Sequence, residues 1–138
     1  MKILFVCKYN RFRSQFAEKY FRRINKNLKV SSAGIIKVDK PLTLGEKKRK
    51  NYVKKKFEIN LTPKSRGIKV SLLENQDKII VIANDIPKSV FNHPNWKNKI
   101  IIWNIPDELG ANKEKINKIV SFIMKKVDNL VKSLENRK

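Results

Sequence analysis

Four short segments with the pattern of strands alternate with stretches of helical pattern and restrict this chain to a narrow set of folds. The strand segments cover residues 3–6, 28–34, 78–83 and 99–103, and apolar runs form most of the first, third and fourth. Strands that alternate with helices are joined by right-handed crossovers and form a parallel sheet with helices on both faces. The sequence therefore predicts a three-layer α/β fold of the flavodoxin-like kind, with a four-stranded parallel sheet.

The segments between these runs have the periodicity of amphipathic helices. Apolar residues recur at helical spacing over residues 15–24, and a longer stripe runs from Asn112 toward the C-terminus. Shorter helices are expected around residues 70–73 and 87–91.

A very basic helix is expected over residues 43–56. Thr43 and Glu46 have the spacing of a capping box at its start. We interpret the lysine and arginine runs of this helix as a solvated face, with a docking surface for acidic partners as the alternative.

Length and composition indicate one domain over residues 1–138. Hydrophobic residues make up 41% of the chain, which is enough for a core despite 33% charged residues. Met1 and Lys2 lead directly into the first strand without the pattern of a signal peptide, and no apolar run approaches a membrane span of about 20 residues. A single cysteine excludes an internal disulfide, and a reactive thiol suits a reducing cytoplasm, where we expect this protein.

The net charge of +21 is extreme for a chain of this size. Such a field attracts polyanions, so acidic phosphoproteins and nucleic acid are the candidate partners. Lysine outnumbers arginine and is spread over nearly every segment, which favours a general cause such as solubility. Nucleic acid is the less favoured partner, because a dedicated site more often combines clustered arginines with exposed aromatic residues.

Cys7, the only cysteine, stands at the end of the first strand pattern and six residues before Arg13 and Ser14. This C-x5-R-S segment connects a strand to a helix. The first amides of a helix have no internal partner and bind anions, and successive N–H groups of a loop add to this effect. We therefore predict a loop that surrounds a phosphate group, with Cys7 at its centre. Its phosphate-binding residues are Lys8, Tyr9, Asn10, Arg11, Phe12 and Arg13.

The residue types of this loop predict covalent catalysis. The helix N-terminus, Arg13 and the Ser14 hydroxyl favour the thiolate of Cys7, which is the nucleophilic form. Arg13 can hold two phosphate oxygens and stabilise the phosphoryl group during transfer. Cys7 would attack phosphorus and form a phosphocysteine that water hydrolyses. The alternative is a buried strand cysteine without a chemical role, which is common for free cysteines.

A general acid for the leaving oxygen is expected at the end of another strand. Asp107 follows the fourth strand as Cys7 follows the first, and the carboxyl ends of parallel strands share one rim. The two residues can therefore meet although 100 residues separate them. Asp85, just past the third strand, is the reserve candidate. The alternative for Asp107 is a turn residue, because Pro-Asp is ordinary turn chemistry.

The order of these motifs resembles that of the low-molecular-weight protein tyrosine phosphatase family. The family loop has an asparagine at the position of Asn10, and residues 30–34 resemble a family strand that ends in Ser-Ala-Gly. Residues 105–107, Ile-Pro-Asp, resemble the acid loop, and residues 62–66 resemble the stretch before the third helix of the family. The resemblance spans most of the chain.

This resemblance implies the phosphotyrosine protein phosphatase I-like version of the fold and a metal-independent phosphomonoesterase of the protein tyrosine phosphatase type. It implies no cofactor and no metal, and a phosphorylated protein or a small aryl phosphate as the substrate. Asp107 would be the general acid. Asn10 and Ser32 would brace the loop by hydrogen bonds rather than take part in bond making.

The chain departs from the family pattern around the substrate. Tyr9 stands where glycine is usual, Arg11 where a small or aliphatic residue lines the substrate slot, and Phe12 where many members have a second cysteine. Tyr9 is expected to restrict the backbone of the loop. Glu108 follows the acid in place of proline, and the aromatic residues that enclose a phenyl ring are missing. These departures keep the phosphatase chemistry and leave the preferred substrate open.

Two other functions fit the same residues. An arsenate reductase-like enzyme would pass oxidising equivalents to further cysteines, so this chain would need an external thiol. A basic protein with a degenerate anion loop would bind phosphate or nucleic acid without catalysis.

Overall fold

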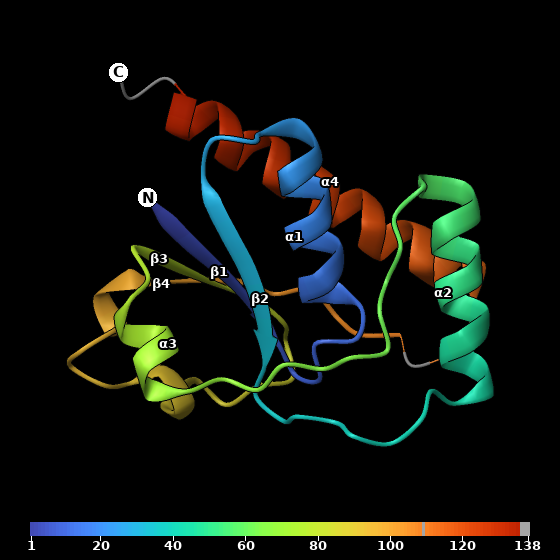
Figure 1. Cartoon of the computed structure of the whole chain (residues 1–138), viewed down its shortest axis with the longest axis horizontal. Coiled ribbons are helices and arrows are strands. Elements are labelled where there is room, and N and C mark those ends of the chain that lie inside the picture. The colour runs from blue at the N-terminus through green and yellow to red at the C-terminus, as the bar shows by residue number, and fades with distance from the viewer. Residues whose placement is uncertain (109, 136–138) are drawn as a thin grey trace.

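A four-stranded parallel sheet forms the centre of the molecule (Figure 1). The computed structural model describes residues 1–108 and 110–135. The strands are β1 (Lys2–Cys7), β2 (Lys29–Gly34), β3 (Lys78–Ile82) and β4 (Ile100–Trp103). They lie in the order β2-β1-β3-β4, and all neighbouring pairs are parallel. The predicted fold class is therefore confirmed.

Helices cover both faces of this sheet. One face packs against α1 (Arg13–Ile24) and α4 (Lys113–Glu135). The other face carries the short α3 (Val70–Glu74) and two 3-10 helices, η1 (Lys88–Phe91) and η2 (Lys97–Lys99). The basic helix α2 (Leu44–Phe57) lies beside one end of α4 (Figure 1).

Alternate residues of the strands face two separate hydrophobic cores, as the period of a strand requires. Ile3 and Phe5 of β1 face the core with α1 and α4, whereas Leu4 and Val6 face the core with α3. Because both faces are covered, β1 and β3 appear in the sequence as continuous apolar runs rather than as alternating patterns.

Helix α2 begins with the capping box that the sequence predicts. Thr43 Oγ1 accepts a hydrogen bond from the Glu46 N–H (3.1 Å), and the Glu46 carboxylate accepts one from the Thr43 N–H (3.0 Å). Most lysines of α2 are exposed, but Arg49 is only 3% exposed and lies over the ring of Phe12. The interpretation of its basic runs as a solvated face is therefore wrong at Arg49, because this side of the helix faces the loop after β1.

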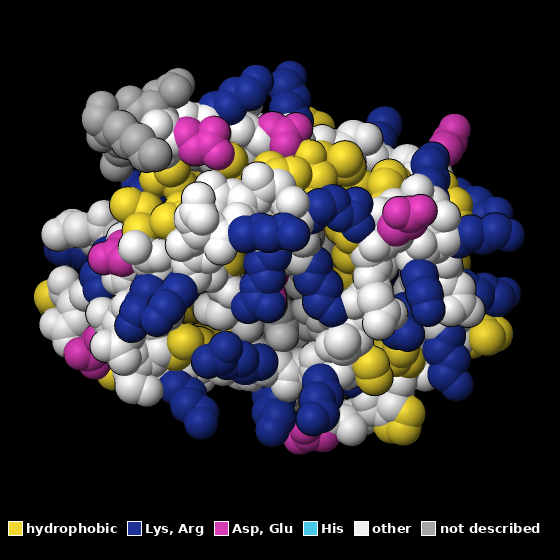
Figure 2. Space-filling model, turned by 45° about the horizontal axis from the view of Figure 1, so that its top comes forward, with side chains coloured by type: hydrophobic (Ala, Val, Ile, Leu, Met, Phe, Trp, Pro, Cys, Tyr) yellow, Lys and Arg dark blue, Asp and Glu magenta, His cyan; other side chains and the backbone are white. Residues whose placement is uncertain are grey.

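Lysine and arginine side chains are scattered over the face of the molecule that Figure 2 shows, with few acidic side chains between them. This agrees with the spread of lysine along the sequence. Among residues 1–108 and 110–135, no helix has both the length and the apolar character that crossing a membrane requires.

The buried side of α4 generates a prediction about stability. Ile123 is fully buried in the core, whereas its neighbour Phe122 is 60% exposed. We expect Ile123→Ala to lower the free energy of unfolding by about 2–5 kcal/mol, because it leaves a cavity in a filled core. Phe122→Ala is the control and should change this free energy by less than about 0.5 kcal/mol. Urea unfolding measures both variants, and equal losses would contradict this orientation of α4.

Candidate active site

The loops that follow β1, β3 and β4 gather at the carboxyl-terminal rim of the sheet (Figure 1). There, Cys7, Arg13 and Asp107 line one small cavity. Its volume of about 10 Å³ has room for roughly one water molecule. The remaining lining residues are Tyr9, Arg11, Phe12, Glu46 and Arg49. The structure thus brings together the three residues that the sequence predicts as nucleophile, phosphate ligand and acid.

Cys7 ends β1 and is 2% exposed. Its Sγ accepts a hydrogen bond from the backbone N–H of Asn10 (3.2 Å) and lies 3.0 Å from the hydroxyl oxygen of Ser14. This hydroxyl oxygen accepts a bond from the Asn10 side-chain amide (2.7 Å), so its own proton is free to point at Cys7. The Asn10 N–H and the Ser14 hydroxyl group therefore both contact the sulfur and fix its position in the loop.

Asn10 lies at the centre of the hydrogen bonds of the loop. Its φ of 55° lies in the left-handed region, which asparagine tolerates better than most residues. The NH₂ group of its side-chain amide donates to Ser14 Oγ and to Ser32 Oγ (3.0 Å). The oxygen of the same amide, Oδ1, accepts a hydrogen bond from the Arg66 N–H (3.0 Å). Ser32 in turn donates to Glu18 (2.5 Å). The structure therefore places Asn10 and Ser32 in the contact that a bracing role requires, while that role itself stays a prediction.

Tyr9, at the position where glycine is usual, does not need a left-handed backbone, since Asn10 and Glu58 are the only described non-glycine residues with positive φ. The carbonyl of Tyr9 accepts a hydrogen bond from Ser65 Oγ (2.8 Å). Gln15 donates to the carbonyl of Asn10 (2.7 Å). The sequence reasoning missed Ser65 and Gln15 as supports of the loop. The sequence feature that could have indicated Ser65 is its place in the segment 62–66, which resembles a family stretch.

Arg13 begins α1, is 1% exposed, and directs its guanidinium group toward the loops after β3 and β4. It donates to both carboxylate oxygens of Asp85 (3.2 and 3.3 Å) and to the carbonyl of Ile105 (2.9 Å). Asp107 Oδ2 lies 3.5 Å from its Nη2. Arg13 is therefore held from two loops at once.

The two candidate acids occupy different positions relative to the sulfur. Asp107 lines the cavity together with Cys7, and its Oδ1 accepts the N–H of Glu108 (2.9 Å). Asp85 is bound through both oxygens to Arg13 and does not line this cavity. Of the two candidates, Asp107 therefore shares the cavity with Cys7, whereas Asp85 is bound to Arg13.

The side chain of Arg11 turns away from the loop and toward α2. Its Nη1 lies 3.2 Å from each carboxylate oxygen of Glu46, and its Nη2 donates to the carbonyl of Lys40. Burial raises the pKa of Glu46, but the hydrogen bonds from the Thr43 backbone and from Arg11 outweigh burial and lower this pKa overall. Arg11 therefore connects the loop to α2, in addition to its predicted place among the phosphate-binding residues.

Arg49 and Glu46 are cavity residues that the sequence reasoning missed. Arg49 donates to the carbonyl of Glu108 and lies 4.0 Å from Glu46. Burial lowers the pKa of the Arg49 guanidinium, and the negative charge of nearby carboxylates opposes part of this lowering. The signal was the helical spacing of Glu46, Arg49 and Val53, which puts Arg49 in line with a buried valine.

Three arginines around the cavity keep a buried donor without an acceptor. Arg11, Arg13 and Arg49 each bury an Nε–H that has no partner in the part of the chain that the structure describes. The three cationic side chains that line this cavity favour a negatively charged ligand there. Within residues 1–108 and 110–135, no group of three or more His, Cys, Asp or Glu side chains could hold a metal ion.

Comparison with solved structures identifies the same fold in several enzymes. A protein tyrosine phosphatase from Entamoeba histolytica is 22% identical, covers 99% of this chain over 97% of its own, and has a TM-score of 0.82. An arginine phosphatase from Geobacillus stearothermophilus is 21% identical over 98% of this chain and 93% of its own, with a TM-score of 0.79. An arsenate reductase from Archaeoglobus fulgidus is 22% identical over 94% of this chain and 98% of its own, with a TM-score of 0.68.

A strand, a cysteine-centred anion loop and a helix, placed on this sheet, define a class of cysteine-dependent phosphatases. The sequence profile of the low molecular weight phosphotyrosine protein phosphatase family matches residues 2–138. The chain belongs to this family, as the resemblance of its motifs predicted. A search of curated protein sequences finds no match.

The close approach of β2 to the loop generates a prediction about Gly34. A Cβ atom at this position would lie 2.8 Å from the backbone nitrogen of Asn10 and 2.8 Å from the carbonyl carbon of Tyr9. We expect Gly34→Ala to deform the loop and to weaken the binding of inorganic phosphate roughly tenfold, the equivalent of about 1.4 kcal/mol of strain. Isothermal titration calorimetry measures this affinity.

Gly67→Ala is the matched control for this experiment. Gly67 pairs with Gly34, but its Cβ atom would meet only Lys37 Cβ, at 3.3 Å. It should leave phosphate binding unchanged. Unaltered binding in Gly34→Ala would show that the loop does not depend on this contact.

Proposed function

We propose that this protein is a metal-independent phosphomonoesterase that works through a phosphocysteine intermediate at Cys7. The observation that carries this proposal is the single cavity in which the Cys7 sulfur, the Arg13 guanidinium and the Asp107 carboxyl group meet. Membership of a phosphatase family and the three cationic side chains that line the cavity support it.

In the first step, the loop and Arg13 hold the phosphoryl oxygens while Cys7 attacks phosphorus. The contacts of the Asn10 N–H and the Ser14 hydroxyl with the sulfur hold it in position for this attack. The phosphorus–sulfur bond forms as the bond from phosphorus to the leaving oxygen breaks, and the protonated Asp107 gives its proton to that oxygen.

In the second step, water attacks the phosphocysteine. The Asp107 carboxylate accepts a proton from this water, so that an oxygen–phosphorus bond forms as the phosphorus–sulfur bond breaks. Cys7 leaves as a thiolate, and the same two groups contact its sulfur. The products are inorganic phosphate and the starting form of the enzyme.

For the substrate we propose a phosphotyrosine-type ester on a protein or a small aryl phosphate. Membership of the low molecular weight phosphotyrosine protein phosphatase family supports this substrate class. Arsenate reduction has less support, because Cys7 is the only cysteine and the reaction would need an external thiol. A reducing cytoplasm, which preserves a free thiol, is the proposed location.

Replacement of the nucleophile tests the proposal directly. We expect Cys7→Ser to abolish hydrolysis of 4-nitrophenyl phosphate in the presence of EDTA, because the serine hydroxyl is a far weaker nucleophile. Phosphate release measured by colorimetry checks this, and orthovanadate should inhibit the wild-type protein. Unchanged turnover in Cys7→Ser would refute the phosphocysteine mechanism. Phosphate binding without any turnover in the wild type would instead support the non-catalytic anion-binding alternative.

Replacement of the acid should depend on the leaving group. We expect Asp107→Asn to reduce kcat/KM for phenyl phosphate by about 10²-fold or more, and less for 4-nitrophenyl phosphate, because the nitrophenolate leaves without a proton. Asp85→Asn is the control. Because Asp85 supports Arg13, it should lower kcat/KM by a similar factor for both esters. If the loss depended on the leaving group in Asp85→Asn and not in Asp107→Asn, Asp85 would be the acid.

A further inference from the structure

A second, much larger hollow adjoins the active site and has no place in the chemistry above. Its volume is about 1270 Å³. It lies between the connection that follows β2, residues 35–41, and the segment 63–76 that leads into and past α3. We call this hollow, with its end at Lys2, the basic groove.

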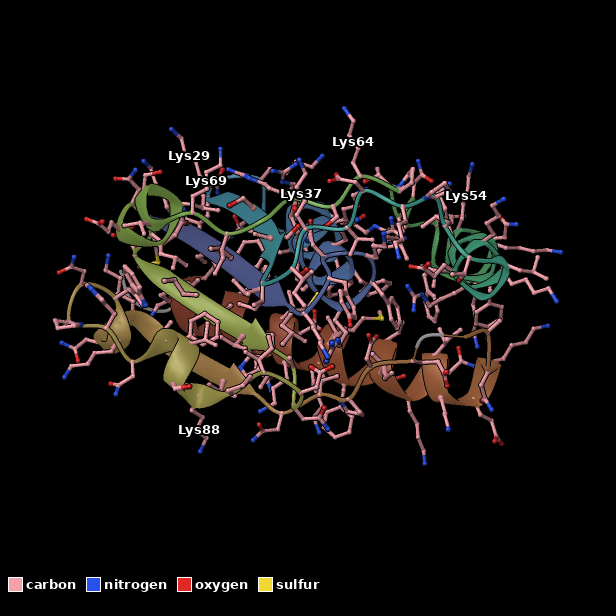
Figure 3. All side chains as sticks on the ribbon, turned by 90° about the horizontal axis from the view of Figure 1, so that it is seen from below. Lys29, Lys37, Lys54, Lys64, Lys69 and Lys88 are labelled. Carbon is pink, nitrogen blue, oxygen red and sulfur yellow. The ribbon has the colours of Figure 1, made fainter. Side chains whose placement is uncertain are left out.

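The basic groove is more positive than the protein as a whole. Seven lysine and arginine residues line it against one acidic residue, Asp39. In the complete chain the ratio is 33 to 12, so the groove holds about one basic residue more than eight charged positions would on average, and it gathers these residues on one concave surface. The basic lining residues are Lys2, Arg11, Lys37, Lys40, Lys64, Arg66 and Lys69. Figure 3 shows Lys37, Lys64 and Lys69 along one side of the molecule, with Lys88 on the opposite side.

The groove is physically continuous with the phosphate loop. Arg11 lines both the groove and the catalytic cavity. Ser65, from the groove lining, donates to the carbonyl of Tyr9 (2.8 Å), and the Arg66 N–H donates to Asn10 (3.0 Å). The groove therefore begins directly beside the loop that carries Cys7, with the Arg11 side chain between the two hollows.

The dimensions and lining of the groove suit an extended peptide. It reaches from Arg11, beyond the end of β1, back to Lys2 at the start of that strand. A six-residue strand is about 20 Å long, which equals the length of five or six extended residues. Half-buried Ile35, Ile68 and Leu72 contribute apolar surface between the cationic side chains.

The same lining is less suited to single-stranded nucleic acid. Such sites combine positive charge with aromatic side chains on which bases stack. None of the residues that line the groove is Phe, Tyr or Trp.

We propose that the basic groove binds an acidic segment of the phosphoprotein whose phosphorylated residue occupies the catalytic cavity. This inference rests on the proposed function, since it assigns a substrate class to the same site. Carboxylates of the bound segment pair with Lys37, Lys64 and Lys69 at the rim, and its apolar side chains contact the floor. The groove thereby selects among phosphoproteins by the charge that flanks the phosphorylated residue.

The test compares three substrates on the intact protein. Two are phosphotyrosine peptides of equal length, flanked on both sides by glutamate in one and by glutamine in the other, and the third is 4-nitrophenyl phosphate. At low ionic strength we expect the wild type to have a kcat/KM about tenfold higher for the glutamate peptide, with the difference decreasing as salt is added.

Two triple variants separate the groove from the overall charge. The first is Lys37→Gln, Lys64→Gln and Lys69→Gln, all exposed residues of the groove. The second is Lys54→Gln, Lys88→Gln and Lys126→Gln, which are exposed and outside it. The groove variant should lose most of the preference for the glutamate peptide, and this loss should be at least about threefold larger than that of the control variant. Both variants should hydrolyse 4-nitrophenyl phosphate like the wild type.

Each other outcome overturns the inference and leaves the proposed function separately testable. Equal losses in the two variants would assign the preference to the net charge alone. Normal hydrolysis of 4-nitrophenyl phosphate without any preference for the glutamate peptide would refute the groove while keeping the phosphatase. If no ester is hydrolysed, fluorescence anisotropy with an unphosphorylated glutamate peptide tests the groove independently. Tighter binding of an oligothymidylate than of this peptide, sensitive to the groove variant, would identify a nucleic-acid site instead.

Discussion

The side-chain amide of Asn10 is the interaction on which the rest of the site depends. Its two ends reach β2 through Ser32, α1 through Ser14 and the segment before α3 through Arg66. With these bonds in place, a left-handed residue turns the loop so that its own backbone N–H faces the Cys7 sulfur. The arrangement is compact because Gly34 lets the loop backbone lie against β2. The position of the Cys7 sulfur thus depends on hydrogen bonds that span most of the rim of the sheet.

Much of this could be predicted from the sequence, for identifiable physical reasons. Strands buried on both faces are continuous apolar runs, so the sheet and its crossovers could be inferred from pattern alone. Cys7, Arg13 and Ser14 stand on one strand–loop–helix unit, where spacing along the chain fixes distance in space. Asp107 could be placed at the same rim because the carboxyl ends of parallel strands coincide.

Residues on separate elements were harder to infer. Arg49 lies within a run of lysines, and its burial depends on how α2 docks against the loop, which no local pattern encodes. Arg11 has a long side chain with several acceptors in reach, and its partner Glu46 comes from α2, 35 residues along the chain. The pairing of Asp85 with Arg13 likewise depends on two loops that meet only in the folded protein. Tertiary placement, rather than propensity, decides such contacts.

The cavity at Cys7 is therefore lined by residues from different parts of the fold. Cys7 and the groups that contact it belong to β1 and the loop that leads into α1, whereas Glu46 and Arg49 come from α2, which lies beside α4 rather than on the sheet. Substitutions on the inner side of α2 therefore change the lining of the cavity without replacing the Asn10 and Ser14 groups that contact the sulfur. The part of the cavity that holds the sulfur and the part that closes over it are thus carried by separate segments of the chain.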